Sequence, residues 1–320
     1  MEKYRTHSIA LLLVLAAPLA ASADLLHDYN LVVVNNLSTT SETEGRAIIG
    51  GNVSGNATQF GFKLPSNTPA SSTTPEVGGN ITNSQVTVSV GSLLQGGATY
   101  PSGNNLIFGN GGSRTMDSSI TASLPGTLQG ELNTDSAYYK ALTTNSTVTA
   151  PTNQPGPVTF TAVAGANHIA VFNVDGSIFS NQNVQQYNLV NNTGATSFVF
   201  NVFGTSISFN QGNFTGGLAT TAFSSSAIFN FYQATSLSFT NHFYGAVLAP
   251  LATFSNSTAV EGSVFVQSFN QSGEVHLPNY AGPSISSVPE PASIALLGIG
   301  ALGGLALDAR RRRARARAQG

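Results

Sequence analysis

One sequence pattern recurs three times near the middle of the chain at an almost constant interval. It reads FNVDGSIF from Phe172, FNVFGTSISF from Phe200 and FNFYQATSLSF from Phe229, so the intervals between the starts are 28 and 29. In each copy apolar residues alternate with small polar ones, which is typical of a strand with one buried face. Strands that recur at a fixed interval, with Gly and Asn turns between them, indicate stacked coils whose Phe side chains pack on one another inside.

Shorter echoes extend this periodicity toward both ends of the body of the chain. GNVS at Gly51 returns as GNIT at Gly79, again at an interval of 28, and GAVLA at Gly245 returns as GSVFV at Gly262, at an interval of 17. The sequence therefore predicts a mainly β fold, a single-chain β-solenoid (β-helix). A β-sandwich is the alternative, but its strands recur about every 8–12 residues, which leaves an interval near 28 unexplained.

One segment of the body has helical rather than strand periodicity. Apolar side chains recur at close to helical intervals from Leu128 and Leu132 to Leu142. The pattern predicts a helix near residues 128–144, packed along the side of the solenoid or over one of its ends. Asp135 is positioned to cap the second half of this helix.

Composition limits what the body, residues 24–287, can bind. It has no Cys, so a domain of this kind depends on its own core rather than on disulfides. It carries four Lys or Arg against 11 Asp or Glu, a formal charge of −7. Such a body has no basic surface for a phosphate backbone, and we expect no nucleic-acid partner.

The sequence contains no recognisable catalytic or metal-binding motif. No G-x-S-x-G is present, and none of His27, His168, His242 and His276 has another His three or four residues away. We therefore predict no catalytic residues, no metal site and no cofactor, with His242 and His276 at ordinary strand positions. The alternative is an exopolysaccharide-modifying β-helix enzyme, a lyase or a glycoside hydrolase, and hydrolysis needs only two carboxylates. The acids considered for that role are Asp117, Glu131, Asp135 and Asp175.

Two of the repeated strands place hydroxyl groups at alternate positions, as Ser-Ile-Ser at 206–208 and Ser-Leu-Ser at 236–238. Ranks of such groups on a flat sheet could bind a regular lattice, either a glycan or, by analogy with ice-binding solenoids, ice. The alternative is an ordinary solvated face. Tyr232, Tyr244 and Tyr280 would add rings for sugar stacking wherever they are exposed.

Segment 1–23 has the layout of a secretory signal peptide. Basic residues are followed by an apolar run over 9–20 and by Ala21 and Ala23, which form an A-x-A cleavage site. This segment is thus predicted to direct export through the Sec translocon and to be removed, so that the mature chain begins near Asp24.

The C-terminal segment, residues 288–320, has three parts in a fixed order: a Pro-Glu-Pro motif, an apolar run over 292–307 and an arginine cluster. As a helix the apolar run would be about 24 Å long, a little short of the ~30 Å hydrocarbon core, and we predict that it spans the membrane. The arginines would then stay cytoplasmic and stop transfer. The motif consists of Val288, Pro289, Glu290 and Pro291, and the cluster of Arg310, Arg311, Arg312, Arg313, Arg315 and Arg317.

This order of motif, apolar run and arginines resembles the PEP-CTERM sorting signal. The resemblance implies a Gram-negative bacterium that makes exopolysaccharide, with an exosortase that cuts an inner-membrane-anchored precursor near the Pro-Glu-Pro. It also implies release or transfer to the cell surface or the extracellular matrix. The two prolines keep the motif extended and outside the helix, where a protease can reach it. A plain tail anchor that is never cut is the alternative.

Four short segments, in order along the body, carry a second resemblance. They are DYNLVV at 28–33, EGRAIIGGNV at 44–53, FYGAVLAP at 243–250 and EGSVFV at 261–266. Together they resemble the choice-of-anchor A domain, an adhesive module of bacterial surface proteins, and imply a solenoid-like adhesive fold without assigned chemistry.

Both resemblances predict a non-catalytic adhesive or structural protein associated with exopolysaccharide, biofilm or other surface glycans. The alternatives are the polysaccharide-active enzyme and an ice-binding protein.

The sorting prediction is tested by the intact mass of the protein released from the envelope of producing cells. We expect a chain that ends upstream of residue 292, because the cut falls near the Pro-Glu-Pro motif. Recovery only of species that end at Gly320 would show that the tail is an uncut anchor.

Overall fold

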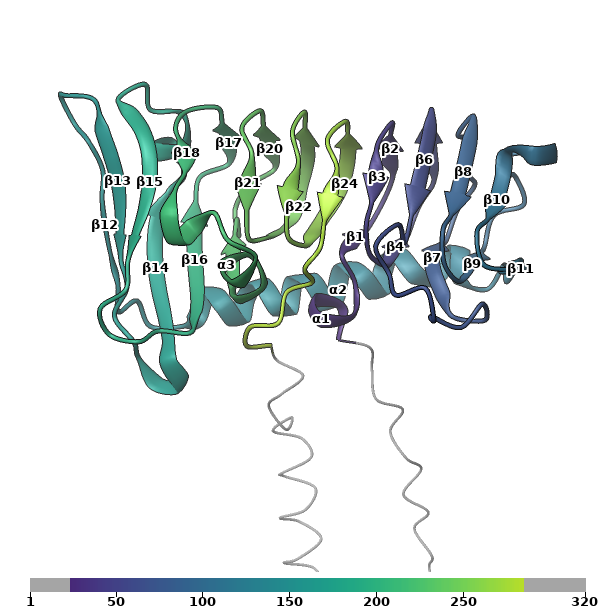
Figure 1. The fold of residues 1–320 in the computed structure, drawn as a ribbon, viewed down its shortest axis with the longest axis horizontal. Coiled ribbons are helices and arrows are strands. Elements are labelled where there is room, and N and C mark those ends of the chain that lie inside the picture. The colour runs from purple at the N-terminus through teal and green to yellow at the C-terminus, as the bar shows by residue number, and fades with distance from the viewer. Residues whose placement is uncertain (1–23, 285–320) are drawn as a thin grey trace, which may run out of the picture.

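Parallel strands stack in three rows along one long axis and form the three faces of a solenoid (Figure 1). The computed structural model describes residues 24–284. The predicted signal peptide, the Pro-Glu-Pro motif, the apolar run 292–307 and the arginine cluster lie outside the described residues. Within residues 24–284 no helix is long and apolar enough to span a membrane.

The solenoid confirms the predicted fold class, and its strands divide among faces A, B and C. Face A contains β1 (Leu31–Val33), β4 (Ala47–Ile49), β7 (Thr73–Val77), β9 (Ser92–Gln95), β11 (Arg114–Met116), β14 (Ile169–Asp175), β16 (Ser197–Phe203), β19 (Ala227–Asn230) and the first halves of β22 (Ala246–Asn256) and β24 (Val264–Gln271). Face B contains the second halves of β22 and β24 with β2 (Leu37–Thr39), β5 (Val53–Gly55), β17 (Ser206–Phe209) and β20 (Ser236–Phe239).

Face C is built from two sheets. The larger contains β3 (Glu42–Thr43), β6 (Ala57–Phe60), β8 (Gln85–Val88), β10 (Leu106–Phe108), β21 (Phe243–Tyr244), β23 (Val260–Glu261) and β25 (Val275–His276). The smaller contains β12 (Thr147–Thr149), β13 (Gly156–Thr161), β15 (Val184–Val190) and β18 (Asn213–Phe214). Among the paired strands of the described chain only β12 and β13 run antiparallel, so β12 closes that end of the solenoid.

The chain does not wind from one end of the solenoid to the other. It begins in the middle at β1 and adds coils outward to β11. Helix α2 (Ile120–Ala141) then carries it back along face A, and the remaining coils return from β14 to β24, which pairs with β1 (Figure 1). The last coil therefore lies against the first, and we call this junction the seam. Two short α-helices, α1 (Leu25–Asp28) and α3 (Thr221–Ser226), and four 3-10 helices lie in the connections of the described chain. The 3-10 helices are Gly103–Asn105, Ala166–His168, Gly176–Ser180 and Gly216–Leu218.

Helix α2 confirms the helix predicted from the sequence, but it begins at Ile120, ahead of the predicted start at 128, and ends at Ala141. Its 22 residues give a length of about 33 Å. That length equals about seven strand spacings of ~4.8 Å, and the helix extends from β9 to β16. Tertiary packing explains the early start, because Pro125 lies directly over Gly50, where a Cβ atom would come within 2.9 Å of its Cα. Asp135 lies inside the continuous helix, so the predicted capping role is wrong.

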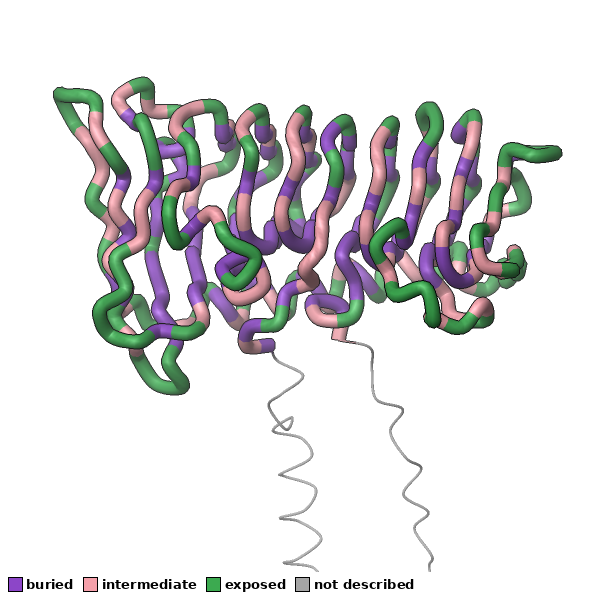
Figure 2. The backbone as a smooth tube through the Cα atoms, in the orientation of Figure 1, coloured by how far each residue is buried: buried purple, intermediate pink, exposed green. Residues whose placement is uncertain are grey.

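Apolar side chains from successive coils pack together inside the solenoid and form its core. Figure 2 shows buried positions recurring along the strands from coil to coil. The Phe residues that begin the three repeats lie in register and confirm the predicted stack. Phe172 and Phe200 have ring centroids 4.6 Å apart, and Phe200 and Phe229 have centroids 4.2 Å apart, with interplanar angles of 4° and 6°. Offset stacking and complete burial of these rings make the column a major source of stability.

A second apolar layer fills the space between face A and helix α2, and buried amides cross it. Asn230 accepts a hydrogen bond from Ser136 Oγ at 2.7 Å and donates to the Ser136 carbonyl at 2.9 Å. Asn201 donates to the Tyr139 carbonyl at 2.7 Å and accepts from Asn230 at 2.9 Å. Because these amides would be costly to bury unpaired, they fix the position of the helix on face A.

Removing the middle ring of the Phe column tests its contribution to stability. We expect Phe200→Ala to lower the free energy of unfolding by about 3–5 kcal/mol, because the substitution leaves a cavity between two stacked rings. Chemical denaturation measures the change. Phe62→Ala is the matched control, since the Phe62 side chain is 47% exposed, and a loss as large as that of Phe200→Ala would contradict the account.

Candidate functional site

Face B presents two straight ranks of small polar side chains. Neighbouring strands pair in register, so the alternation within each strand places outward residues beside outward residues from coil to coil. The structure brings together the two Ser-x-Ser segments predicted from the sequence and continues their ranks across further strands. One rank is Ser206, Ser236, Thr253 and Ser268, and the other is Ser208, Ser238, Ser255, Asn270, Ser38 and Ser54.

The side chains of these ranks point outward from face B. None of their Ser and Thr side chains hydrogen-bonds to any residue in the described part of the chain, whereas the apolar residues between them, such as Leu237 and Phe254, point inward and are buried. The ranks contain no charged residue. Their spacing is set by the sheet at about 4.8 Å between strands and about 6.7 Å along each strand, so face B is a regular, neutral grid of hydroxyl groups.

An asparagine ladder continues face B toward the β11 end. Asn36 Oδ1 accepts a hydrogen bond from the Asn52 backbone N–H at 2.9 Å, and Asn52 Oδ1 accepts from the Asn80 N–H at 2.8 Å. Asn80 Oδ1 in turn accepts from the Thr99 N–H at 3.0 Å. These side chains link consecutive coils at the turns, and they hold the grid rigid at its edge.

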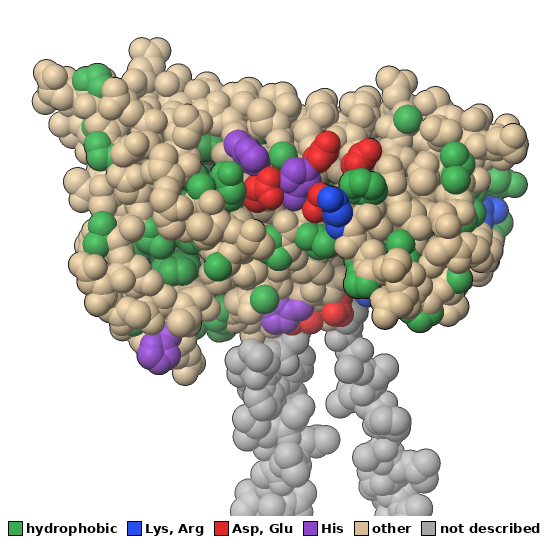
Figure 3. Space-filling view, viewed as in Figure 1, with side chains coloured by type: hydrophobic (Ala, Val, Ile, Leu, Met, Phe, Trp, Pro, Cys, Tyr) green, Lys and Arg blue, Asp and Glu red, His purple; other side chains and the backbone are tan. Residues whose placement is uncertain are grey.

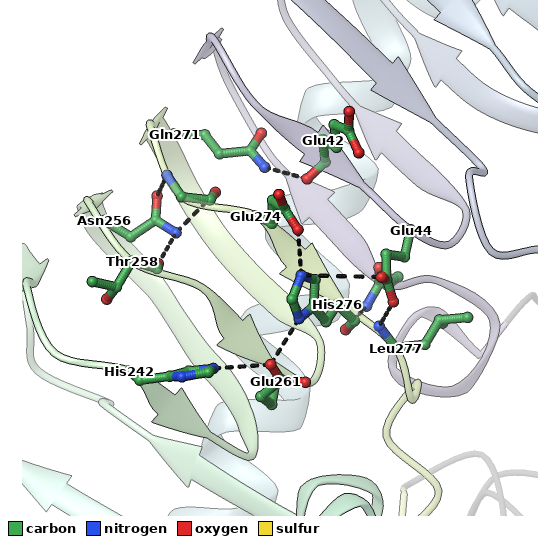
Figure 4. Close-up of polar contacts among 12 residues, drawn as sticks. Glu42, Glu44, His242, Asn256, Thr258, Glu261, Gln271, Glu274, His276 and Leu277 are labelled. Atoms are coloured by element: carbon green, nitrogen blue, oxygen red, sulfur yellow. Dashed lines mark hydrogen bonds and ion pairs between the residues drawn. The ribbon is translucent and has the colours of Figure 1, made fainter. Parts of the chain in front are cut away.

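Face C carries a separate cluster of charged side chains at the seam (Figure 3). Tyr244, Glu261 and His276 occupy matching outward positions on β21, β23 and β25, and Glu44 follows β3 on the far side of the seam. His276 Nδ1 lies 2.7 Å from Glu261, its Nε2 contacts Glu274, and Glu44 is 4.0 Å away (Figure 4). Glu44 also accepts a hydrogen bond from the Leu277 N–H at 2.9 Å.

The cluster favours the charged form of His276. Its hydrogen bond with Glu261 raises the pKa of His276 to about 9, against the opposing effect of burial and with help from Glu274. The same hydrogen bond from His276 lowers the pKa of Glu261, and His242 adds a second contact at 2.9 Å. We call this cluster the seam latch, because it joins the last coil to the first.

The strand position predicted for His242 is wrong, because His242 lies just before β21, whereas His276 lies on β25 as predicted. Both imidazoles contact Glu261, and sequence reasoning missed this shared contact. The echo of GAVLA in GSVFV could have placed Glu261 opposite Tyr244, but nothing in the sequence shows that β25 lies beside β3. The carboxylates of Glu261 and Glu274 hydrogen-bond to imidazole nitrogens of His242 and His276. Within residues 24–284 no group of three or more His, Cys, Asp or Glu side chains is arranged to hold a metal ion.

The acidic residues considered for catalysis are not gathered into one site. Asp117 accepts hydrogen bonds from Ser119 just before α2, and Asp175 accepts one from Ser177 at the other end of the solenoid. Glu131 and Asp135 lie one turn apart on α2. Burial, followed by the charges of Asp24 and Glu131, raises the pKa of Asp135 to about 7.

The three tyrosines singled out from the sequence differ in exposure. Tyr280 is buried and hydrogen-bonds to the Pro283 carbonyl, so the sugar-stacking role considered for it is wrong. The Tyr232 ring contacts the Lys140 ammonium group at 4.5 Å. Tyr244 is half-exposed and stacks on His242 with ring centroids 4.9 Å apart.

The seam latch predicts a pH-dependent contribution to stability. Because the pKa of folded His276 is raised, its contribution is complete below about pH 6.5 and is lost as the pH rises through about 9. We expect His276→Gln to lower the free energy of unfolding by about 1–2 kcal/mol at pH 6 and by much less at pH 10. Denaturation at both pH values measures this, with the exposed His168→Gln as control. An equal loss at both pH values would show that His276 stabilises the fold by packing alone.

Comparisons with known proteins match the body of the chain and its C-terminal segment separately. Residues 22–277 match a family model described as "Putative Ice-binding-like adhesive domain", and residues 287–313 match the PEP-CTERM protein-sorting motif. A search of curated proteins gave no match. One solved structure, an ice-binding protein from the Antarctic ascomycete Antarctomyces psychrotrophicus, is 12% identical and aligns over 81% of this chain and 98% of its own, with a TM-score of 0.31. At that score the likeness supports no conclusion about this chain. The family match spans most of the sequence, and the chain belongs to the ice-binding-like adhesive domain family, with a PEP-CTERM sorting motif at its C-terminal end.

Proposed function

We propose that the protein is an exported adhesive or structural component of the cell surface or matrix, and that it binds exopolysaccharide without modifying it. The observation that carries this proposal is the grid of free hydroxyl groups on face B. A rigid, neutral grid can make many weak hydrogen bonds to a polymer that presents its own hydroxyl groups at regular intervals, and such contacts add up through multivalency. The adhesive family supports the same role.

The route to the surface is also part of the proposal. Cleavage after Ala23 would follow Sec-dependent export, and an exosortase would cut near Pro289 to Pro291 while the 292–307 helix and the arginines hold the precursor in the inner membrane. The fold suits this arrangement. Ser284 Oγ donates a hydrogen bond to Asp24 at 2.6 Å, so the two ends of the described chain leave the solenoid together, beside α1 and near the middle of its length (Figure 1).

Ice binding is the second candidate, and the regularity of face B favours it. Ranks of hydroxyl groups with fixed spacing could order water as readily as they bind a glycan. The measurement is thermal hysteresis of the purified protein. A difference between the melting and freezing temperatures, with faceted ice crystals, would show ice binding. Loss of that difference in a face B variant would favour ice as the natural ligand over polysaccharide.

Bulky substitutions on face B test the adhesive proposal directly. We expect the double variant Ser238→Tyr and Ser255→Tyr to lower retention on the producer's exopolysaccharide by tenfold or more, or about 1.4 kcal/mol, because two raised rings would hold the polymer away from the grid. Thr87→Tyr, an outward position on face C, is the control. Equal retention of the double variant and the wild type in a co-sedimentation assay would show that face B is not the contact surface.

A further inference from the structure

A pocket of about 340 Å³ lies at the C-terminal end of helix α2, away from face B and the seam latch. It exists because helix α2 is shorter than face A. Helix α2 ends at Ala141 above β16, so β14, the edge strand of face A at this end of the solenoid, lies beyond the end of the helix. The volume is at the small end of the roughly 300–1,000 Å³ that small-molecule sites occupy.

The floor of the pocket is apolar and fixed in place. Leu142, Ile169 and Val171 supply it. Asn145 holds the chain that follows the helix against β14, because its Nδ2 donates to the Ile169 carbonyl at 3.0 Å and its Oδ1 accepts from the Val171 N–H at 2.8 Å. The floor is therefore present before any ligand arrives.

The rim of the pocket is polar and free to bind. Tyr138, Thr143 and Asn167 line the pocket, and none of their side chains hydrogen-bonds to another residue within 24–284. The lining contains no Asp, Glu, Lys, Arg or His. A ligand that satisfies this site must be neutral, must carry several hydroxyl groups and must have an apolar face for the floor and the Tyr138 ring.

The backbone of the rim is held in an unusual conformation. Asn167 and His168 are consecutive non-glycine residues with φ angles of 57° and 58°, in the left-handed region that L-residues disfavour. Such residues concentrate at ligand-binding sites. Here the conformation places the Asn167 side chain at the pocket, whereas His168 does not line it.

We propose that this pocket binds one unit of a neutral saccharide. A pyranose ring has the required chemistry, since its C–H face can pack on Tyr138 and the apolar floor while its hydroxyl groups reach Thr143 and Asn167. The site would recognise a chain end or a side branch, and it would act independently of the extended contacts proposed for face B.

Two glycine substitutions test the proposal with the backbone matched. Glycine adopts positive φ without strain, so Asn167→Gly removes a rim group and His168→Gly does not, while both relax the same turn. We would titrate the full-length chain with neutral trisaccharides of glucose, mannose and galactose, and with trigalacturonic acid as a charged comparison, using saturation-transfer NMR. We expect one neutral trisaccharide to bind, Asn167→Gly to weaken it at least tenfold, and His168→Gly to change it less than about twofold.

Three outcomes would overturn the inference: no binding of any neutral trisaccharide to the wild type, equal effects of the two glycine substitutions, or tighter binding of trigalacturonic acid. The Ser238→Tyr and Ser255→Tyr variant separates this site from the proposed function. This variant should still bind the trisaccharide even if it is no longer retained on the exopolysaccharide. Loss of both trisaccharide binding and retention would show that the trisaccharide binds on face B instead.

Discussion

The parallel pairing of β1 with β24 is the interaction on which the rest of the structure depends. Leu31, Val32 and Val33 lie in register with residues 264–266, and this short ladder joins two half-solenoids formed by separate parts of the chain. Without it each half would expose an edge strand in the middle of the molecule, where unpaired backbone groups favour aggregation. On face C the seam latch crosses this junction through Glu44, which lies 4.0 Å from His276 and accepts a hydrogen bond from the Leu277 N–H. The contact of Ser284 with Asp24 reinforces the same junction.

Helix α2 follows from that arrangement. A chain that starts in the middle and builds outward must return across the whole solenoid before it can build the other half, and α2 is the return path. Because the helix covers face A, it removes one of the three faces from solvent and leaves faces B and C for partners. The helix ends before β14, and the pocket lies between its C-terminal end and that strand. One topological choice thus accounts for the covered face, the exposed grid and the proposed saccharide site.

Much of this could be predicted from the sequence, and the remainder could not for identifiable reasons. The interval near 28 predicts the strands and the Phe172, Phe200 and Phe229 column, because that interval repeats where coils are consecutive in sequence. The ranks of face B were visible only at 206–208 and 236–238, since Thr253, Ser268 and Ser38 come from coils of other lengths. The seam and its latch join residues such as Glu44 and His276, 232 positions apart, and no local pattern encodes that pairing. The early start of α2 at Ile120 depends on the close approach of Pro125 to Gly50, which only the tertiary structure reveals.

The central claim is that the protein binds exopolysaccharide and leaves it intact. Size-exclusion chromatography of the purified protein mixed with the producer's own exopolysaccharide, with separate detection of sugar and protein, tests this most directly. The account predicts that protein elutes with the polymer and that the polymer keeps its size over prolonged incubation. A polymer peak that moves to smaller size would contradict the account and would identify the protein as an enzyme.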